Sequence, residues 1–411
     1  MPAHFDLIVI GGGSGGLACA QRAADHGARV ALVEPRPLGG TCVNVGCVPK
    51  KIMFYAASLA EGLQDAAGYG FDVSVQGHDW RALKQARDAY IARLNGIYAA
   101  NLERRKVVHV QATARFDDAH TIVAGDELLT APQVVVASGG RPAVPDLPGA
   151  ELGITSDGFF ALEQRPASVA IVGSGYVAVE LAGVFASLGT RVTLVIRHDQ
   201  VLRSFEAMLS AALMRQMRED GIEIVDHADA TRLSRVGDHH ELSTADGRIL
   251  GPFHCVLWAI GREPTVESLQ LSRAGVAQYD DGFIITNRYQ ATNVPGVYAI
   301  GDVTGRAALT PVAIAAGRRL ADRVFGGQAG RYLDYDLIPT VIFSHPPIGT
   351  LGLTEAAARD LHGDAVKCYT AGFTPMYHAL TAHKRRAEMK LVTVGPEERI
   401  VGLHVIGQGA D

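Results

Sequence analysis

The chain alternates short runs of apolar residues with longer stretches in which small apolar residues recur at helical spacing. Leu7–Ile10 and Val30–Val33 are uninterrupted apolar runs, and Val169–Val172 and Val192–Ile196, the latter with one threonine, repeat this arrangement later in the chain. Continuous runs of this length are typical of parallel strands that are buried on both faces. The pattern therefore predicts an α/β fold with two separate parallel sheets.

A glycine-rich turn follows the first strand directly. It reads Gly11-Gly12-Gly13-Ser14-Gly15-Gly16 and opens a helix of small residues. Gly11 permits a tight turn, Gly13 lets backbone N–H groups approach a pyrophosphate, and Gly16 allows close helix–strand packing. Glu34 ends the next strand, where a carboxylate suits a ribose 2′-hydroxyl. The pattern indicates a dinucleotide site, and a glycine-rich turn without a ligand is the alternative.

A second turn of this kind follows Val169–Val172. It reads Gly173-Ser174-Gly175-Tyr176-Val177-Ala178. The strand after it ends in Arg197 and His198, with Arg203 shortly beyond, and no acid stands there. Guanidinium groups bind phosphate oxygens in a bidentate manner, so this strand end favours the 2′-phosphate of NADPH. A solvated basic edge is the alternative.

Two dinucleotide sites in one chain suggest an electron relay with one resident flavin and one exchangeable nicotinamide cofactor. A third segment agrees with this interpretation. Gly296–Asp302 is an apolar run that ends in Gly-Asp, and a carboxylate there can accept hydrogen bonds from ribitol hydroxyls.

The most informative segment contains two cysteines. Cys42 and Cys47 are separated by four residues, and an amphipathic helix is expected after Pro49. Cys47 is thus expected just before a helix N-terminus with Lys50 one turn on, and both features favour a thiolate. A structural zinc site, an inert disulfide and two unrelated thiols are the alternatives to a redox-active pair.

Composition narrows the class of protein. The 411 residues carry 38 Lys and Arg against 43 Asp and Glu, a formal net charge of −5 that argues against nucleic-acid binding. No apolar run is long enough for a membrane helix, and the N-terminus has no signal-peptide pattern. Five unevenly spaced cysteines do not suit a secreted disulfide scaffold. We expect a cytoplasmic enzyme, with Cys19, Cys255 and Cys368 as small buried side chains.

The segment Gly39–Lys51 resembles the flavin-dependent pyridine nucleotide–disulfide oxidoreductases. Further likeness lies in Thr155–Phe160, Ile196–His198, Leu202–Phe205 and Phe343–Thr350, and it extends over essentially the whole chain. The resemblance implies two Rossmann-like dinucleotide-binding domains plus an α+β C-terminal interface domain, in a homodimer. It implies an FAD-binding domain over 1–141, an NADPH-binding domain over 142–263, a central domain over 264–335 and a dimerisation domain over 336–411.

The resemblance also implies residue roles. Cys47 would be nearest the flavin and Cys42 would attack the substrate disulfide, while Lys50 and Glu180 would pair near the flavin ring. Tyr176 would cover the nicotinamide pocket. The implied FAD contacts are Gly11, Gly13, Ser14, Gly15, Gly16, Glu34, Thr41, Ala114, Asp302 and Thr310. The implied NADPH contacts are Gly173, Ser174, Gly175, Val177, Arg197, His198, Arg203, Gly261 and Val341.

Substrate choice within the family follows from charge. Lipoamide dehydrogenases carry an acid where this chain has Arg197, and trypanothione reductases carry acidic and bulky residues where it has Ala18 and Gln21. The resemblance is closer to members that reduce glutathione disulfide with NADPH. It implies substrate contacts at Ser14, Arg22, Tyr98 and Arg318, although Gln21 stands where some members have a second arginine. Ordinary solvated arginines and a plain core tyrosine are the alternatives.

Family members use a histidine in a C-terminal His-Pro-Thr-x-x-Glu segment as acid/base. The printed chain ends at Asp411 before such a segment, and we expect it to be part of a longer protein; a natural short form is the alternative. His345-Pro346 lacks the continuation, so no catalytic histidine is predicted. No metal is expected. Reduction of another small disulfide, and a non-enzymatic FAD/NADPH redox sensor, remain alternative functions.

Overall fold

The computed structural model describes residues 2–411, and the chain forms two compact units. The first comprises residues 2–49, Gln85–Arg141 and Arg262–Tyr335. The second comprises Lys50–Lys84, Pro142–Gly261 and Asp336–Asp411. The four-domain division expected from the sequence is a finer partition, and it stays a prediction.

A parallel five-stranded sheet forms the centre of the first unit, with strand order β19-β8-β2-β3-β4. Its strands are β2 (Leu7–Ile10), β3 (Val30–Val33), β4 (Val108–Val110), β8 (Gln133–Val136) and β19 (Val297–Ala299). Side chains alternate across this sheet, so Leu7 and Val9 join one hydrophobic core and Ile8 and Ile10 join another. The two apolar runs predicted as strands are therefore buried on both faces.

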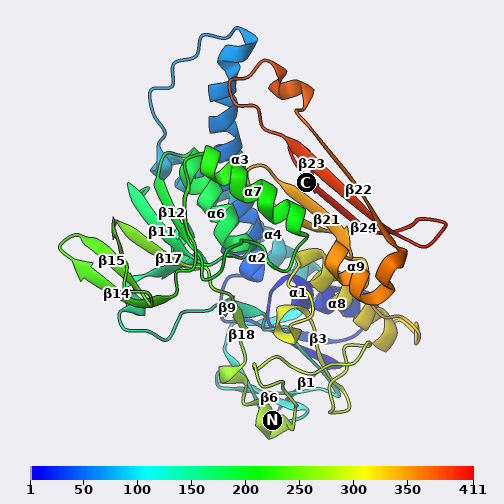
Figure 1. Cartoon of the computed structure of the whole chain (residues 1–411). Coiled ribbons are helices and arrows are strands. Elements are labelled where there is room, and N and C mark those ends of the chain that lie inside the picture. Colours follow the sequence, from blue (N-terminus) through cyan, green and yellow to red (C-terminus); the bar gives the residue numbers. More distant parts are fainter. Residues whose placement is uncertain (1) are drawn as a thin grey trace. The chain divides into compact units, whose positions relative to one another are not determined.

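Helices α1 (Ser14–Asp25) and α8 (Thr310–Val324) lie side by side against the first unit's core (Figure 1). The opposite core contains residues of a four-stranded sheet of β1 (Ala3–His4), β5 (Ala114–Asp118), β6 (Thr121–Ala124) and β7 (Glu127–Thr130). A two-stranded ladder joins β9 (Gly140–Pro142) and β18 (Arg262–Pro264). The short helix α2 (Gly40–Asn44) and most of α4 (Trp80–Arg104) complete the unit.

The second unit repeats the parallel arrangement with strand order β10-β17-β11-β12-β13. These strands are β10 (Ile154–Thr155), β11 (Ser168–Val172), β12 (Arg191–Val195), β13 (Glu223–Val225) and β17 (Cys255–Trp258). An antiparallel meander of β14 (Ala230–Val236), β15 (His239–Thr244) and β16 (Ile249–Phe253) shares its core. The helices are α3 (Cys47–Asp65), α5 (Ser156–Ala161), α6 (Tyr176–Ser187) and α7 (Ala207–Glu219), and only the first three residues of α3 belong to the first unit.

An antiparallel sheet follows in the C-terminal part of the second unit, in the order β20-β21-β24-β23-β22 (Figure 1, orange to red). Its strands are β20 (Thr340–Ile342), β21 (Ile348–Gly352), β22 (Val366–Phe373), β23 (Ala387–Val394) and β24 (Arg399–Ile406). Helix α9 (Glu355–His362) packs on this sheet through Ala358. The predicted class of two Rossmann-like sheets with an α+β C-terminal part is confirmed.

Two details differ from the sequence-based expectations. Helix α3 begins at Cys47 itself, so this cysteine is the first residue of the helix rather than the residue before it. Cys19 and Cys255 are buried as expected, but Cys368 is only partly buried. It lies on β22, at the edge of the antiparallel sheet, with its thiol hydrogen-bonded to Glu355. Among the helices of residues 2–411, none has the length and hydropathy needed to cross a bilayer.

Candidate functional site

The first glycine-rich turn connects β2 to α1, as predicted. A Cβ atom at Gly16 would lie 2.0 Å from the carbonyl oxygen of Gly11, so close packing requires this glycine. Gly13 is different, because its φ of −81° suits any residue and a Cβ there would meet only Gly40 Cα, at 3.7 Å. The protein fold therefore does not explain Gly13, and the open position leaves room for a ligand against the turn. Gly175, in the second turn, has a φ of −80° and nothing within 4 Å.

Glu34 stands at the end of β3 and is 6% exposed. Its carboxylate accepts the backbone N–H of Gly12 at 2.7 Å and that of Arg36 at 2.9 Å. These two bonds fix the carboxylate beside the turn. Its predicted contact with a ribose fits this position and remains a prediction.

Ser138 is a candidate ligand contact that the sequence analysis missed. It follows β8, at the same sheet edge as the first turn, and its buried hydroxyl has no hydrogen-bond partner within residues 2–411. An orphaned buried hydroxyl is costly unless a ligand or water satisfies it. The small-residue sequence Ser138-Gly139-Gly140 directly after a buried strand was the available signal.

The other predicted FAD contacts lie in the same unit. Asp302 is the second residue of a short 3-10 helix, Gly301–Thr304, and burial raises the pKa of its carboxyl group while Arg262 opposes the rise. Thr310 begins α8, Thr41 lies in α2 and Ala114 begins β5. The open face of the turn, the orphaned hydroxyl and these groups together fit a flavin dinucleotide.

The two cysteines lie beside each other in the first unit. Cys42 is in α2, Cys47 begins α3, and their side chains are hydrogen-bonded as thiols. Cys42 also contacts the hydroxyls of Ser14 and Thr310, and Cys47 Sγ lies 3.6 Å from Thr310 Oγ1. This adjacency contradicts the interpretation as two unrelated thiols. Within residues 2–411, no cluster of three or more His, Cys, Asp or Glu side chains suits a metal ion.

The electrostatics of Cys42 favour its protonated form. The hydrogen bond with Cys47, and then burial, raise the pKa of the Cys42 thiol above its ordinary value, and the hydroxyls of Thr310 and Ser14 oppose this. Cys42 therefore keeps its proton at neutral pH until a base accepts it. The expected thiolate character of Cys47 stays a prediction.

Lys50 and Glu180 pair in the second unit. Lys50 Nζ lies 2.9 Å from Glu180 Oε1, and the two side chains are 13% and 7% exposed. The same oxygen accepts the backbone N–H of Phe343 at 2.8 Å, and the ammonium group lies 3.8 Å from the centre of the Phe343 ring. The pair is mostly buried, and it is therefore not a solvated pair at the surface.

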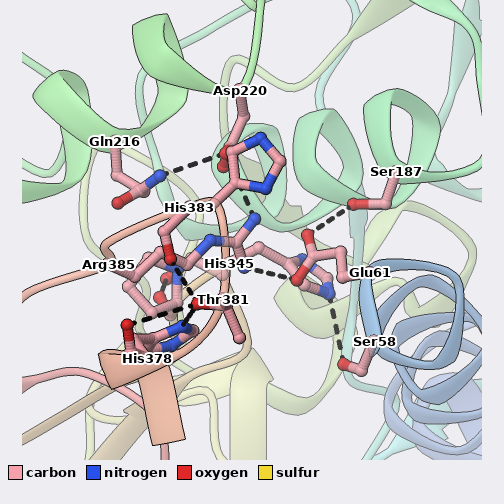
Figure 2. A network of polar contacts seen from close by, with 12 residues as sticks. Ser58, Glu61, Ser187, Gln216, Asp220, His345, His378, Thr381, His383 and Arg385 are labelled. Carbon is pink, nitrogen blue, oxygen red and sulfur yellow. Dashed lines mark hydrogen bonds and ion pairs between the residues drawn. The ribbon is translucent and has the colours of Figure 1, made fainter. Parts of the chain in front are cut away.

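A larger polar network ties α3 to the rest of the second unit farther along the helix (Figure 2). Glu61 of α3 accepts the Ser187 hydroxyl of α6 at 2.8 Å and pairs with Arg385. Arg385 also reaches Asp220, just after α7, at 3.1 Å. The same face of α3 therefore carries the ion pair from Lys50 to α6 and, about three turns later, this second attachment at Glu61.

The second turn and the arginines after β12 also lie in the second unit. The backbone N–H of Leu202 donates to Ser174 O at 2.7 Å, which brings the loop carrying Arg203 against the turn. Arg197 and Arg203 are exposed, and neither makes an ion pair within residues 2–411, whereas His198 is half-buried. Tyr176 begins α6 and is 39% exposed. This arrangement suits a phosphate-bearing ligand.

The remaining predicted NADPH contacts have recognisable positions in the same unit. Val177 is the second residue of α6, Gly261 lies just beyond β17 and Val341 is in β20. A Cβ at Gly261 would find open space, so this backbone is also free for approach. Their contact with a ligand stays a prediction.

The predicted substrate residues differ in their surroundings. Arg22 Nε lies 2.6 Å from Asp322 Oδ1, and the buried Asp322 also binds His26 and Arg331. Arg318 is exposed and forms no ion pair within residues 2–411. Tyr98 packs partly against the first unit's core, and burial and then the nearby Cys42 raise the pKa of its hydroxyl. Tyr98 is thus both a core aromatic and a neighbour of the thiol pair.

Comparison with known proteins agrees with this geometry. The family model described as pyridine nucleotide-disulphide oxidoreductase matches residues 5–317. The chain belongs to this family. The family's dimerisation-domain model matches residues 338–411, which contain the antiparallel sheet.

Two curated relatives of this pyridine nucleotide-disulphide oxidoreductase are glutathione reductases. The protein of Schizosaccharomyces pombe is 45% identical, over 98% of this chain and 90% of its own length. The protein of Yarrowia lipolytica is 42% identical, with the same two coverages.

Proposed function

We propose that the protein reduces glutathione disulfide with NADPH, using FAD and the Cys42–Cys47 pair, as a homodimer. One observation carries this proposal: the two sulfurs are adjacent, and Cys42 contacts Ser14, which belongs to the first dinucleotide turn. The similarity to two glutathione reductases over nearly the whole chain supports the substrate.

The residues present suit both cofactors. Gly13, Glu34, Ser138, Asp302 and Thr310 would hold FAD in the first unit. In the second unit, NADPH would bind along Gly175 and Val177, with Arg197 and Arg203 on its 2′-phosphate. FAD, when bound, supplies the two-electron transfer between the nicotinamide and the disulfide.

The thiol steps balance without a further reductant. Two electrons and two protons convert the Cys42–Cys47 disulfide to two thiols. The Cys42 sulfur gives up its proton and attacks glutathione disulfide, whose S–S bond breaks and releases one glutathione that takes up a proton. The Cys47 sulfur then gives up its proton and attacks Cys42 in the mixed disulfide, which restores the protein disulfide and releases the second glutathione with a proton taken up. One NADPH and one proton thus yield two glutathione molecules and NADP⁺.

Charge on the chain suits an anionic substrate. Arg318 is exposed and has no carboxylate partner among the described residues, so it can bind a glutathione carboxylate. Asp322 holds the guanidinium of Arg22 at 2.6 Å, which orients a second cation. Tyr98 would contact the substrate beside Cys42. We expect the enzyme in the cytoplasm.

Purified protein tests the proposal directly. It should be yellow and should oxidise NADPH when glutathione disulfide is added. A panel with coenzyme A disulfide, lipoamide and trypanothione disulfide separates this activity from reduction of another small disulfide. A colourless protein, equal use of NADH, or no turnover of any disulfide would contradict the proposal.

The 2′-phosphate contact gives a sharper prediction. The double variant Arg197→Ala/Arg203→Ala should raise the KM for NADPH by about 10-fold or more and change that for NADH little, because charge-assisted bonds to phosphate are lost. Steady-state kinetics with both nucleotides measure this. Arg191→Ala, at the exposed start of β12, is the matched control. Equal effects on the two nucleotides would remove the phosphate argument.

A further inference from the structure

Two asparagines near the cysteine pair have no role assigned by the family resemblance, although Asn44 stands within the segment that carries it. Asn44 belongs to the segment between Cys42 and Cys47, and Asn95 lies in the middle of α4. Both are in the first unit. Their amide groups bond to each other, with Asn95 Nδ2 donating to Asn44 Oδ1 at 3.0 Å.

Each amide also binds the backbone that leads into the first cysteine. Asn95 Nδ2 donates to Leu38 O at 2.7 Å. Asn44 Nδ2 donates to Gly40 O at 3.0 Å and to Pro37 O at 3.1 Å. These side-chain amides add to the backbone bonds of α2 and to the bond from the Gly39 N–H to Gly12 O. The segment Pro37–Asn44 is thus attached to a long helix through Asn95.

This attachment lies close to the reacting sulfurs. Cys42 is two residues before Asn44, and the thiol pair contacts the hydroxyl of Thr310 from another helix. Tyr98, one turn beyond Asn95 on α4, lies near Cys42. Helix α4 therefore places Tyr98 near the Cys42 thiol, and its Asn95 holds the segment to which Cys42 belongs.

We propose that Asn95 is a positioning residue for the redox segment: by donating to Leu38 O and Asn44 Oδ1, it holds Cys42 at the location where it meets Cys47 and Thr310. This role rests on the proposed function for its catalytic consequence, but the placement of the sulfur can be measured without any disulfide substrate. Asn95 acts through Asn44, so the two substitutions should not add.

The experiment compares Asn95→Ala and the nearly isosteric Asn95→Asp with wild type. Asp replaces the donor by an acceptor facing Leu38 O and Asn44 Oδ1, so it should be at least as harmful as Ala although it fills the same space. A role in packing alone would leave Asn95→Asp close to wild type. Asn101→Ala, on the same helix with an exposed bond to Arg104, is the matched control.

The first readout is alkylation of the reduced holoenzyme by iodoacetamide between about pH 6 and about pH 10, with Cys42 and Cys47 followed as separate peptides. Contact with Cys47 raises the pKa of Cys42. Loss of the Asn95 hydrogen bonds should therefore move the pH profile of Cys42 alkylation toward that of an ordinary thiol, near pH 8.5. A wild-type profile in both Asn95 variants would overturn the proposal.

The second readout is turnover. Displacement of a reacting group by about 1 Å can cost about 100-fold in rate, so kcat should fall by about 10- to 100-fold with the KM for NADPH unchanged. Asn44→Ala should act similarly, and the double variant should be no worse than the more damaging single one. If the wild-type protein does not turn over glutathione disulfide, only the proposed function is contradicted. The alkylation profiles still test the positioning role of Asn95. An unchanged kcat in Asn95→Asp would contradict the positioning role of Asn95.

Discussion

At the scale of single residues, Glu180 shows how a buried charge is satisfied. One of its oxygens accepts both the Lys50 ammonium group and the Phe343 backbone N–H, while the Phe343 ring faces the same ammonium group. Residues 50 and 180 are 130 positions apart, and only the family resemblance connected them before the structure. Periodicity and composition carry no information about such distant pairs.

The ion pair gives a stability prediction. Glu180→Gln should lower the free energy of unfolding by about 3 kcal/mol, because it leaves the Lys50 charge buried without a counter-charge. Glu398→Gln is the matched control, since Glu398 pairs with Lys367 at an exposed site and should contribute little to stability. Urea unfolding measures both. Similar losses in the two variants would contradict a buried pair.

His345 gives a pH prediction at the same scale. It is 5% exposed, it lies 3.4 Å from Ser58 Oγ through Nε2, and Glu61 and Arg385 are its charged neighbours (Figure 2). Burial lowers its pKa, with Glu61 opposing and Arg385 adding to the shift. The unfolded state therefore binds the proton more readily, and stability should be lost as the pH falls below about 6.5.

The comparison variant for this effect is His345→Gln. At pH 8 it should be less stable than wild type because packing is lost. The difference in the free energy of unfolding should narrow below about pH 6.5, since only wild type loses stability through protonation of this histidine. Unfolding curves across this pH range measure the gap. The exposed His362→Gln should leave the pH dependence as in wild type. A constant gap for His345→Gln would contradict the prediction.

At the scale of elements, the sequence predicted buried strands well. Val30–Val33 has the same bounds in the structure, and the second sheet's Val192–Ile196 is shifted by one residue to Arg191–Val195. Such strands have apolar residues on both faces and so stand out in the sequence. The C-terminal sheet did not stand out, because β22 is exposed over most of its length and lacks an apolar run. Only the resemblance indicated it.

The dinucleotide turn is an element whose glycines have separable roles. Gly16→Ala should destabilise the fold, because its Cβ would lie 2.0 Å from Gly11 O. Gly13→Ala has an allowed backbone and no close neighbour, so it should leave the stability of FAD-free protein unchanged or raise it by about 0.4–1 kcal/mol. It should nevertheless sharply reduce bound FAD. Thermal unfolding and the flavin absorbance of purified protein measure the two effects separately.

The residues of the candidate site that belong to a motif could be predicted from the sequence. The isolated polar residues of the site could not. The glycine turns, Cys42 and Cys47 follow from local spacing. Ser138 and Asn95 did not, because a serine after a strand and an asparagine within a helix have no distinguishing pattern. Their importance arises only from folding: it buries the Ser138 hydroxyl without a partner, and it brings Leu38 O and Asn44 Oδ1 to the Asn95 amide.

At the scale of the whole molecule, the matched dimerisation region contains exposed apolar side chains. Met376, Leu380 and Phe373 are 88%, 61% and 49% exposed. We predict that Met376→Asp/Leu380→Asp weakens the dimer, because charges in a subunit interface lose their hydration. Sedimentation velocity measures the monomer fraction. Ile249→Asp, which is equally exposed but outside residues 338–411, should leave the dimer intact.

The first unit's sheet is completed late in the chain, and this has a consequence for synthesis. Strand β19 joins β8 only at Val297–Ala299, and Thr310 must follow before it can meet Cys47. A ribosome has therefore made the chain as far as Thr310 before the thiols of the nascent chain gain this neighbour. During that interval the cysteines are open to oxidants and chaperones, and a pause in translation near α8 would prolong the exposure.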